Sequence, residues 1–211
     1  MRNGLLSFAL VVVAIIAASS SALAHPHVWV TVHSEVVYSP DGIVKGIRHA
    51  WTFDDMFSAY AIQGIAHAKD GEFTREELSS LAEVNVTSLK EFDYFTYARV
   101  NGSEVPFVDP TDYWMDSRLS LHFMLPLKTP VVAKRLQIEI YDSTIFVDFE
   151  PGKDTPVSLV GAPAGCQLQI DVLHAPTTSE QLQLNELDAN PLAPSSSFGE
   201  IFANKFVVSC P

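Results

Sequence analysis

Apolar and polar residues alternate along residues 28–38, and this pattern limits the possible folds more than any other stretch of the chain. In an extended strand, valines at even positions lie on one face and the polar and aromatic residues at odd positions lie on the other. The turn signal Pro40-Asp41-Gly42 separates this strand from a second one over residues 43–53. The sequence therefore predicts a β-hairpin over residues 27–53.

The pattern changes after this hairpin. Asp54 and Asp55 can cap a short helix, and Thr74 with Glu77 forms a capping box for a second helix that reaches about Lys90. Strands are predicted for most of the remaining chain, at residues 92–100, 105–108, 117–125, 135–141, 144–149 and 167–173. The predicted fold class is α+β: a mainly antiparallel, sandwich-like β-sheet with a helix–loop–helix insertion at about 54–91 after the first hairpin.

The first 24 residues have the three parts of an export signal. Arg2 provides a positive charge, residues 5–18 form an apolar run, and Ala22-Leu23-Ala24 is a small-x-small cleavage pattern. The apolar run is shorter than the roughly 20 residues that a membrane-spanning helix needs. We therefore expect cleavage after Ala24, a single periplasmic domain over residues 25–211, and no stable membrane anchor.

Charge and cysteine content narrow the classes of partner. The formal net charge of −12 argues against nucleic acid and favours cations, although the same charge also serves solubility. The two cysteines, Cys166 and Cys210, are expected to form a structural disulfide in an oxidising compartment. They do not form a Cys-x-x-Cys pair, so a cysteine-based metal site is not expected.

Two histidines lie directly after the predicted cleavage site. Cleavage would place His25 at the new N-terminus and His27 two residues later. An amine with two imidazoles suits Zn(II) or Ni(II), and also Cu(II). Pro26 has no amide proton, which excludes the N-terminal X-X-His chelate formed through deprotonated amides. A histidine brace or a simple His/His chelate remains, and the alternative is that cleavage exposes two histidines that bind nothing.

Further metal ligands would come from elsewhere in the fold. A hairpin register in which paired residue numbers sum to about 82 puts His33 opposite His49 and His27 beside Asp55. A slip of one residue would instead put Arg48 opposite His33 and remove this second cluster. His27 and His33 lie roughly 20 Å apart along a strand, so they cannot share one ion. The candidate metal ligands are His25, His27, His49, Asp54, Asp55, His122 and Asp142.

Two of these candidates, His122 and Asp142, can also be explained without binding a metal ion directly. His122 alternates with apolar neighbours, as a hydrogen-bonded strand histidine would. Asp142 and Asp148 flank a predicted strand. Asp142 lies in the predicted turn Tyr141-Asp142-Ser143, where its carboxylate would either bind the ion or hydrogen-bond to one of its ligands.

Residues 66–77 resemble part of an EF-hand calcium loop. Glu77 occupies the twelfth position, where the bidentate glutamate is expected. Ala66 and Ala68 stand where the first and third positions need carboxylates. Asp70 and Glu77 are the carboxylates that remain in this degenerate loop, so Ca(II) binding is not expected.

Five motifs carry a resemblance to a known family. They are His25-Pro26-His27-Val28, His49-x-Trp51-x-Phe53-Asp54-x-x-Phe57-Ser58, Asp70-Gly71-x-x-Thr74-x-x-Glu77-Leu78, Glu91-Phe92-x-Tyr94-Phe95-Thr96 and the Cys210-Pro211 ending. With them, the chain resembles a family of exported bacterial proteins that is named as a domain of unknown function. Its members are described as periplasmic components of ABC-type or nickel/cobalt/zinc transport systems. The resemblance implies a role in periplasmic metal handling, with a divalent metal ion and an inner-membrane metal permease as partners.

These observations lead to three functional hypotheses. The first is a periplasmic divalent-metal-binding accessory protein of a zinc, nickel or cobalt transport system, which is not an enzyme. The second is a histidine-brace copper oxidase, with Trp29 and Trp51 at its substrate face. The third is a metal-free periplasmic interaction module that uses the polar segment 174–197 for docking. Metal titration of the processed protein distinguishes the three hypotheses.

Overall fold

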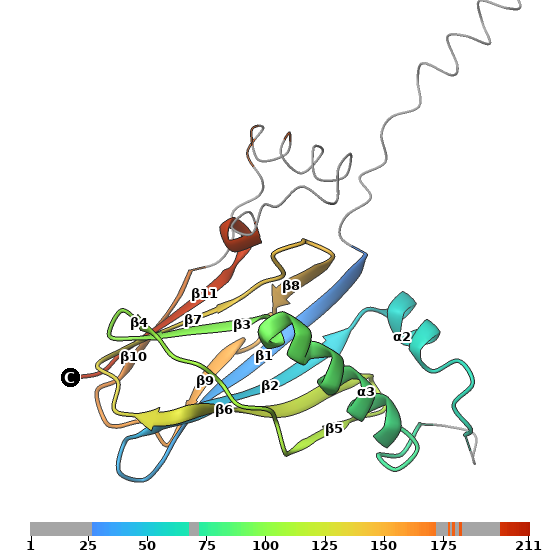
Figure 1. The fold of residues 1–211 in the computed structure, drawn as a ribbon, viewed down its shortest axis with the longest axis horizontal. Helices are drawn as coiled ribbons and strands as arrows, with labels where there is room; N and C mark the ends of the chain where they lie inside the picture. The colour runs from blue at the N-terminus through green and yellow to red at the C-terminus, as the bar shows by residue number, and fades with distance from the viewer. Residues whose placement is uncertain (1–26, 68–71, 172–176, 178, 180–181, 183–198) are drawn as a thin grey trace, which may run out of the picture.

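The structure is a computed structural model that describes residues 27–67, 72–171, 177, 179, 182 and 199–211. Two largely antiparallel β-sheets and two helices make up this part of the chain (Figure 1). The arrangement confirms the prediction of an α+β fold with sandwich-like sheets. The predicted docking segment 174–197 lies almost entirely outside the described residues.

The first sheet is built around the first strand of the fold. Its strand order is β5-β6-β2-β1-β8, and β9 also pairs with β1. β1 is antiparallel to β2 but parallel to both β8 and β9. The bounds of its strands are β1 Val28–Tyr38, β2 Val44–Phe53, β5 Tyr113–Met115, β6 Ser120–Val131, β8 Val147–Pro151 and β9 Val157–Val160.

The second sheet is antiparallel throughout, in the order β10-β11-β7-β3-β4. Its strands are β3 Thr96–Val100, β4 Ser103–Glu104, β7 Arg135–Ile140, β10 Gln167–Asp171 and β11 Asn204–Ser209. The Cys166–Cys210 disulfide lies just beyond the pair Gln167 and Ser209, where β10 and β11 meet. This confirms the predicted disulfide, which joins the last strand to its neighbour.

The core lies between the inner faces of the two sheets. Along β1 the even-numbered residues are buried and the odd-numbered ones are more exposed, as the alternation predicts. Trp51 and Phe123 of the first sheet and Phe206 of the second are among the largest fully buried side chains. Burial of each such apolar side chain contributes roughly 1.5–3 kcal/mol to folding.

The register of the first hairpin corrects one prediction. At the turn Tyr38 pairs with Val44, which fits the predicted sum of 82. A β-bulge then shifts the pairing to a sum of 83, so His49 lies opposite Ser34 and not His33. The bulge precedes Gly46, where an added Cβ would lie 2.3 Å from the backbone oxygen of Leu125 in β6. Only glycine allows so close an approach, and the predicted His33–His49 pair does not form.

Two helices connect β2 to β3. Helix α2 (Asp55–Ala61) begins after Asp54, as predicted. The Thr74–Glu77 capping box also forms, because each residue's side chain accepts a hydrogen bond from the other's backbone N–H. Helix α3 (Ser79–Leu89) nevertheless begins at Ser79, beyond a turn, so the prediction that it starts at Thr74 was wrong.

Helix α3 packs on the core through Ala82 and Val86, with Leu78 just before it. A second contact fixes the chain that leads into the helix: the Arg75 guanidinium lies 3.4 Å above the ring of Trp114 in β5. A cation over a tryptophan face is attracted by the ring quadrupole. The helical segment is thus held against the first sheet by both apolar burial and this cation–π contact.

The segment after α3 departs most from the sequence prediction. Residues predicted to start a strand at Phe92 form a 3₁₀-helical segment, η1 (Lys90–Phe95), and β3 begins at Thr96. Asp93, Tyr94 and Phe95 all have a positive φ, between 47° and 53°, which propensity rules do not anticipate. Residues 105–108 form no strand, although Phe107 makes an isolated β-bridge with Leu127. The short strands β4, β5 and β9 were not predicted.

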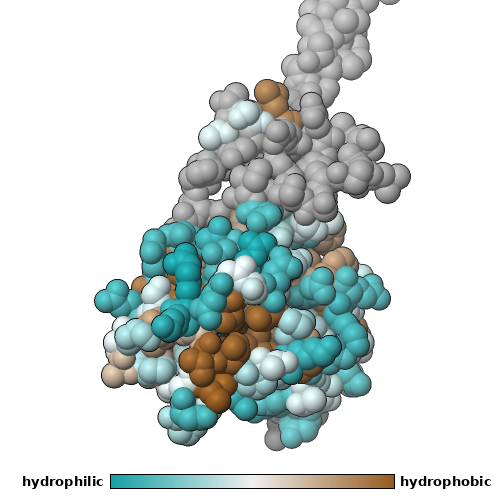
Figure 2. All heavy atoms as spheres, turned by 60° about the vertical axis from the view of Figure 1, so that its left-hand side comes forward, coloured by the Kyte–Doolittle hydropathy of each residue, from teal (hydrophilic) through white to brown (hydrophobic). Residues whose placement is uncertain are grey.

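The surface agrees with the acidic composition. Figure 2 shows mostly hydrophilic side chains around one continuous hydrophobic area near the middle of the face in view. Within the described ranges, no helix combines the length and the apolar character needed to cross a membrane.

Candidate functional site

His27 lies at the start of β1, and its position is fixed by β8. Its backbone N–H donates to the carbonyl of Phe146 at 2.9 Å, and the two rings are in contact with centroids 4.8 Å apart. The side chain of His27 is exposed. His25, the other N-terminal candidate, lies outside the described residues.

Asp54 lies beside the strand that follows His27, and both oxygens of its carboxylate accept backbone hydrogen bonds. Its Oδ2 accepts from the backbone N–H of Trp29 at 3.0 Å, and its Oδ1 accepts from the first turn of α2, at Met56 and Phe57. Partial burial acts to raise the pKa of Asp54, but these backbone hydrogen bonds hold it below its ordinary value. Asp54 therefore caps α2 and ties it to β1, and its neighbour Asp55 is exposed in the first turn.

Asp142 is also occupied by hydrogen bonds. Its Oδ1 accepts from the N–H and hydroxyl of Thr144, both at 2.8 Å, and its Oδ2 accepts from the N–H of Val147 at 3.0 Å. Val147 pairs with Val28, so this turn lies next to the start of β1. The buried Asp142 carboxylate closes the turn that leads into β8.

Asp148 is the carboxylate that the sequence prediction passed over. It lies opposite Trp29 in the parallel β1–β8 pair, on the same face as Phe146 and therefore as His27. Neither of its oxygens accepts a hydrogen bond or joins an ion pair among the described residues. Burial, and then the negative charge of Glu150, raise the pKa of Asp148 above its ordinary value. The alternation of Val147 and Phe149 with Asp148 is the sequence signal that places it on this face.

His49 is 1% exposed and links the two sheets. Its Nδ1 lies 2.9 Å from the Ser34 hydroxyl of β1, and its Nε2 lies 3.4 Å from the Thr96 hydroxyl of β3. The Thr96 hydroxyl donates its proton to the Tyr94 carbonyl, so it accepts from His49, which is then the Nε2–H tautomer. Burial lowers the pKa of His49 to about 3, so the ring is neutral at physiological pH.

The register also separates His49 and His122 from His27. His49 lies opposite Ser34, seven residues beyond His27 along β1, which is roughly 23 Å at about 3.3 Å per residue. His122 lies opposite Ala50, which in turn pairs with His33, so it is similarly distant. Neither residue can share a metal ion with His27.

The surroundings of His122 hold its ring in place. The ring stacks on Trp114 at a centroid distance of 3.7 Å and an interplanar angle of 4°. Its Nε2 lies 3.2 Å from a carboxylate oxygen of Asp116. These contacts match the sequence alternative of a hydrogen-bonded strand histidine.

The degenerate EF-hand loop is described only in part. Asp70 lies outside the described residues. The Oε2 of Glu77 accepts from the N–H and hydroxyl of Thr74 and lies 3.2 Å from Nδ1 of His67. Glu77 thus acts as the glutamate of the capping box.

The start of β1 is therefore where the candidate ligands gather. His27, Asp54 and Asp142 lie around this end of the first sheet, and Asp148 joins them, while His49 and His122 do not. Within the described residues, no three His, Cys, Asp or Glu side chains form a group that could hold a metal ion. A metal centre at this end would therefore need ligands from outside the described residues, where the sequence candidate His25 lies.

Comparison with known proteins identifies the family. Residues 10–210 match the model described as a protein of unknown function, DUF1007. The chain belongs to the DUF1007 family. An uncharacterized 15.5 kDa protein in the trpE 3′ region of Spirochaeta aurantia is similar to it, with 32% identity over 94 residues. This match covers 43% of the chain and 67% of the Spirochaeta protein. The DUF1007 match covers most of the chain, including both described sheets.

Proposed function

We propose that this DUF1007 protein binds a divalent metal ion at the start of β1 and serves as a periplasmic accessory protein of a zinc, nickel or cobalt transport system. The observation that carries the proposal is the pairing of an exposed histidine with an unused carboxylate. His27 and Asp148 lie on one face of adjacent parallel strands, and Asp148 makes no hydrogen bond or ion pair within the described part of the chain.

Strand geometry brings these two side chains within reach of one ion. His27 pairs with Phe146, and Asp148 lies two residues further along β8, so their Cα atoms are roughly 8 Å apart. An imidazole and a carboxylate approaching from that separation can both bind a Zn(II) or Ni(II) ion between them. After cleavage behind Ala24, the amine and imidazole of His25 would supply the remaining ligands.

Such a site suits transfer better than permanent storage. Its ligands lie at a chain end and an exposed face, so the ligands of a permease can approach the ion and replace them. The metal is therefore cargo, and no catalytic role is assigned to it. Asp54 and Asp142 contribute to the fold around the site, because their oxygens accept hydrogen bonds from neighbouring residues. His49 contributes to the core instead.

Isothermal titration with Zn(II), Ni(II) and Cu(II) tests the proposal on protein processed to begin at His25. We expect one ion per chain. His27→Ala and Asp148→Asn should each weaken Zn(II) affinity at least about tenfold, equivalent to 1.4 kcal/mol. One extra residue before His25 should also weaken binding, because it removes the imidazole's neighbouring amine.

His33→Ala is the matched control, since it removes another histidine from the same face of β1. It should leave the affinity unchanged. Equal losses in His33→Ala and His27→Ala, or full affinity in Asp148→Asn, would show that the ion binds elsewhere. Hydrogen peroxide production with copper and ascorbate would favour the copper oxidase hypothesis instead.

A further inference from the structure

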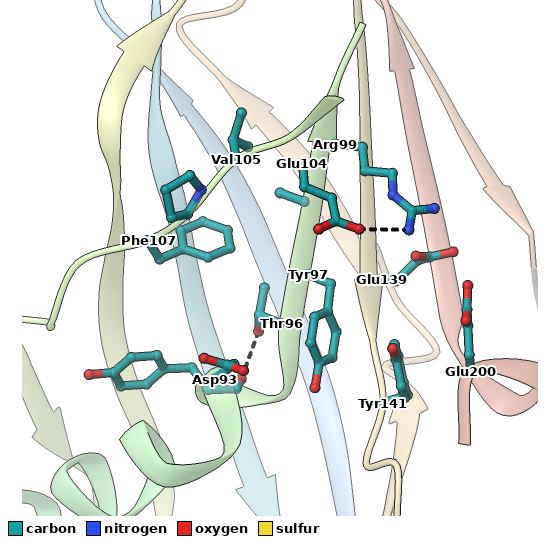
Figure 3. Close-up of a pocket in the computed structure, with 13 residues that line it drawn as sticks. Asp93, Thr96, Tyr97, Arg99, Glu104, Val105, Phe107, Glu139, Tyr141 and Glu200 are labelled. Atoms are coloured by element: carbon teal, nitrogen blue, oxygen red, sulfur yellow. Dashed lines mark hydrogen bonds and ion pairs between the residues drawn. The ribbon is translucent and has the colours of Figure 1, made fainter. Parts of the chain in front are cut away.

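A pocket of about 580 Å³ opens beside β3 in the second sheet, and it shares no lining residue with the candidate metal ligands. Its wall combines three tyrosines, one arginine and four carboxylates, contributed by η1, β3, β4, the end of β7 and the 3₁₀-helical turn η2 (Gly199–Phe202) (Figure 3). The carboxylates are those of Asp93, Glu104, Glu139 and Glu200. The volume is within the range of small-molecule sites.

The aromatic part of the wall is a pair of stacked rings. Tyr97 and Tyr141 have centroids 4.5 Å apart and an interplanar angle of 28°. Tyr97 pairs with Glu139 across β3 and β7, and Tyr141 lies two residues beyond Glu139 on the same face. Figure 3 shows the two rings next to each other, with carboxylates on both sides of Tyr97. The negative faces of such rings attract cations.

Two of the four carboxylates already have a cation. Glu104 pairs with Arg99 at 3.0 Å, and Glu139 pairs with Lys205 at 2.9 Å. Asp93 and Glu200 have no cationic partner among the residues that the structure describes. The pocket therefore has an excess of two negative charges over its own cations.

Glu139 is the most constrained of these groups. The residue is only 4% exposed, and its Oε1 accepts hydrogen bonds from both Lys205 and Gln137. Glu139 lines the pocket, and its Oε2 makes no hydrogen bond to the described part of the chain. Lys205 and Gln137 therefore hold this carboxylate in place at the wall of the pocket.

The tyrosines remain neutral in this surrounding. Burial, and then Tyr97, Glu200 and Glu139, raise the pKa of Tyr141 to about 12. Burial and the charges of Asp93 and Asp142 likewise raise the pKa of Tyr97. The pocket thus opposes further negative charge and favours a cationic ligand.

Gly199 explains how Glu200 comes to face this pocket. A Cβ at Gly199 would lie 2.2 Å from the backbone oxygen of Asp142 and 2.6 Å from the Cα of Ser143. Only glycine allows η2 to lie so close to the turn after β7, where Tyr141 is located. This contact places Glu200 beside the tyrosine pair.

The spacing of the charges decides between a metal ion and an organic cation. Because no three acidic, histidine or cysteine side chains of the described residues lie close enough to hold a metal ion, the carboxylates cannot surround a single ion. They border the stacked rings of Tyr97 and Tyr141 instead. We propose that this pocket binds a linear aliphatic chain carrying two or more ammonium groups, with its methylenes on the tyrosine rings and its ammonium groups at the carboxylates.

Isothermal titration with spermidine tests this proposal on the processed protein. We expect one spermidine per chain, with an affinity that falls as salt concentration rises. Asp93→Asn and Glu200→Gln should each reduce the affinity about tenfold, since each removes a charge worth on the order of 1.4 kcal/mol at the site. Asparagine also tolerates the left-handed backbone at position 93, where φ is 50°.

Glu83→Gln is the matched control, because it removes one negative charge from the exposed side of α3. It should leave spermidine affinity unchanged. Tyr97→Leu should weaken binding by removing one ring of the stack. No heat with spermidine, or an equal loss in Glu83→Gln and Glu200→Gln, would overturn the proposal.

Two further titrations complete the test. Tetralysine presents ammonium groups on a peptide instead of along one alkyl chain: tighter binding than spermidine assigns the natural ligand to a lysine-rich segment, and weaker binding assigns it to a free polyamine. Zn(II) affinity in the Asp93→Asn/Glu200→Gln double variant should equal that of the unaltered protein. Loss of zinc binding in this variant would show that the pocket is a metal site and would contradict the proposal.

Discussion

His49→Ala is expected to lower the free energy of unfolding by about 3–5 kcal/mol, the range for removing a large buried side chain. The substitution leaves a cavity beside Trp51 and Phe123, whose rings lie 5.2 and 5.0 Å from that of His49. It also removes a hydrogen-bond partner from the buried hydroxyls of Ser34 and Thr96. Urea unfolding followed by circular dichroism measures the change.

The control for this variant is His33→Ala, which removes a strand histidine that does not link the sheets. It should cost much less stability than His49→Ala. Zn(II) affinity should be retained in His49→Ala under conditions where the variant is folded. Loss of zinc binding by the folded variant would contradict the separation of His49 from the metal site.

The same histidine gives the protein a defined acid sensitivity. In the unfolded chain a histidine titrates near its ordinary value of 6.5, whereas burial lowers the pKa of His49 in the folded state to about 3. Between these two values the unfolded state binds a proton that the folded state does not, so stability falls as the pH decreases from about 6.5 to about 3. The slope from this residue is at most about 1.4 kcal/mol per pH unit. His49→Gln should reduce the slope measured by urea unfolding; an unchanged slope would assign it to other groups.

Removal of the disulfide is expected to lower the free energy of unfolding by about as much as His49→Ala does. The Cys166–Cys210 bond spans 44 residues, for which loop closure predicts a stabilisation of about 4 kcal/mol. The Cys166→Ser/Cys210→Ser double variant should therefore unfold at a markedly lower urea concentration.

Reduction provides the internal comparison. Dithiothreitol should destabilise the unaltered protein by about the same amount and leave the double variant unaffected. Equal stability with and without reductant would show that the β10–β11 pairing holds this end of the chain by itself.

Local patterns predicted most of the fold correctly. The alternation along β1 indicated its inner and outer faces, and the acidic residue before α2 indicated its N-cap, because both depend on neighbouring residues. The parallel pairing of β1 with β8 and β9 could not be read in this way. It joins residues more than a hundred positions apart, and no local propensity encodes which strands become neighbours.

In the candidate site, too, features set by neighbouring residues were predicted and features set by distant strands were not. The turn allowed the register at Tyr38 to be predicted, but the bulge before Gly46 depends on the approach of β6, which the hairpin sequence does not contain. That one-residue shift removed the His33–His49 pair. Asp148 was not included among the candidate metal ligands for a related reason: its place near His27 depends on which strand lies beside Trp29.

The central position of β1 has a consequence for the order in which the chain can fold. Val28 pairs with Val147, so one edge of the first strand to be synthesised stays unpaired until most of the sequence has followed. Such non-local pairing gives a high contact order and slow folding. For a chain that crosses a membrane N-terminus first, this delay keeps the polypeptide unfolded enough to be threaded. It also leaves the backbone N–H and C=O groups on one edge of β1 open to pairing with other chains until β8 has been synthesised.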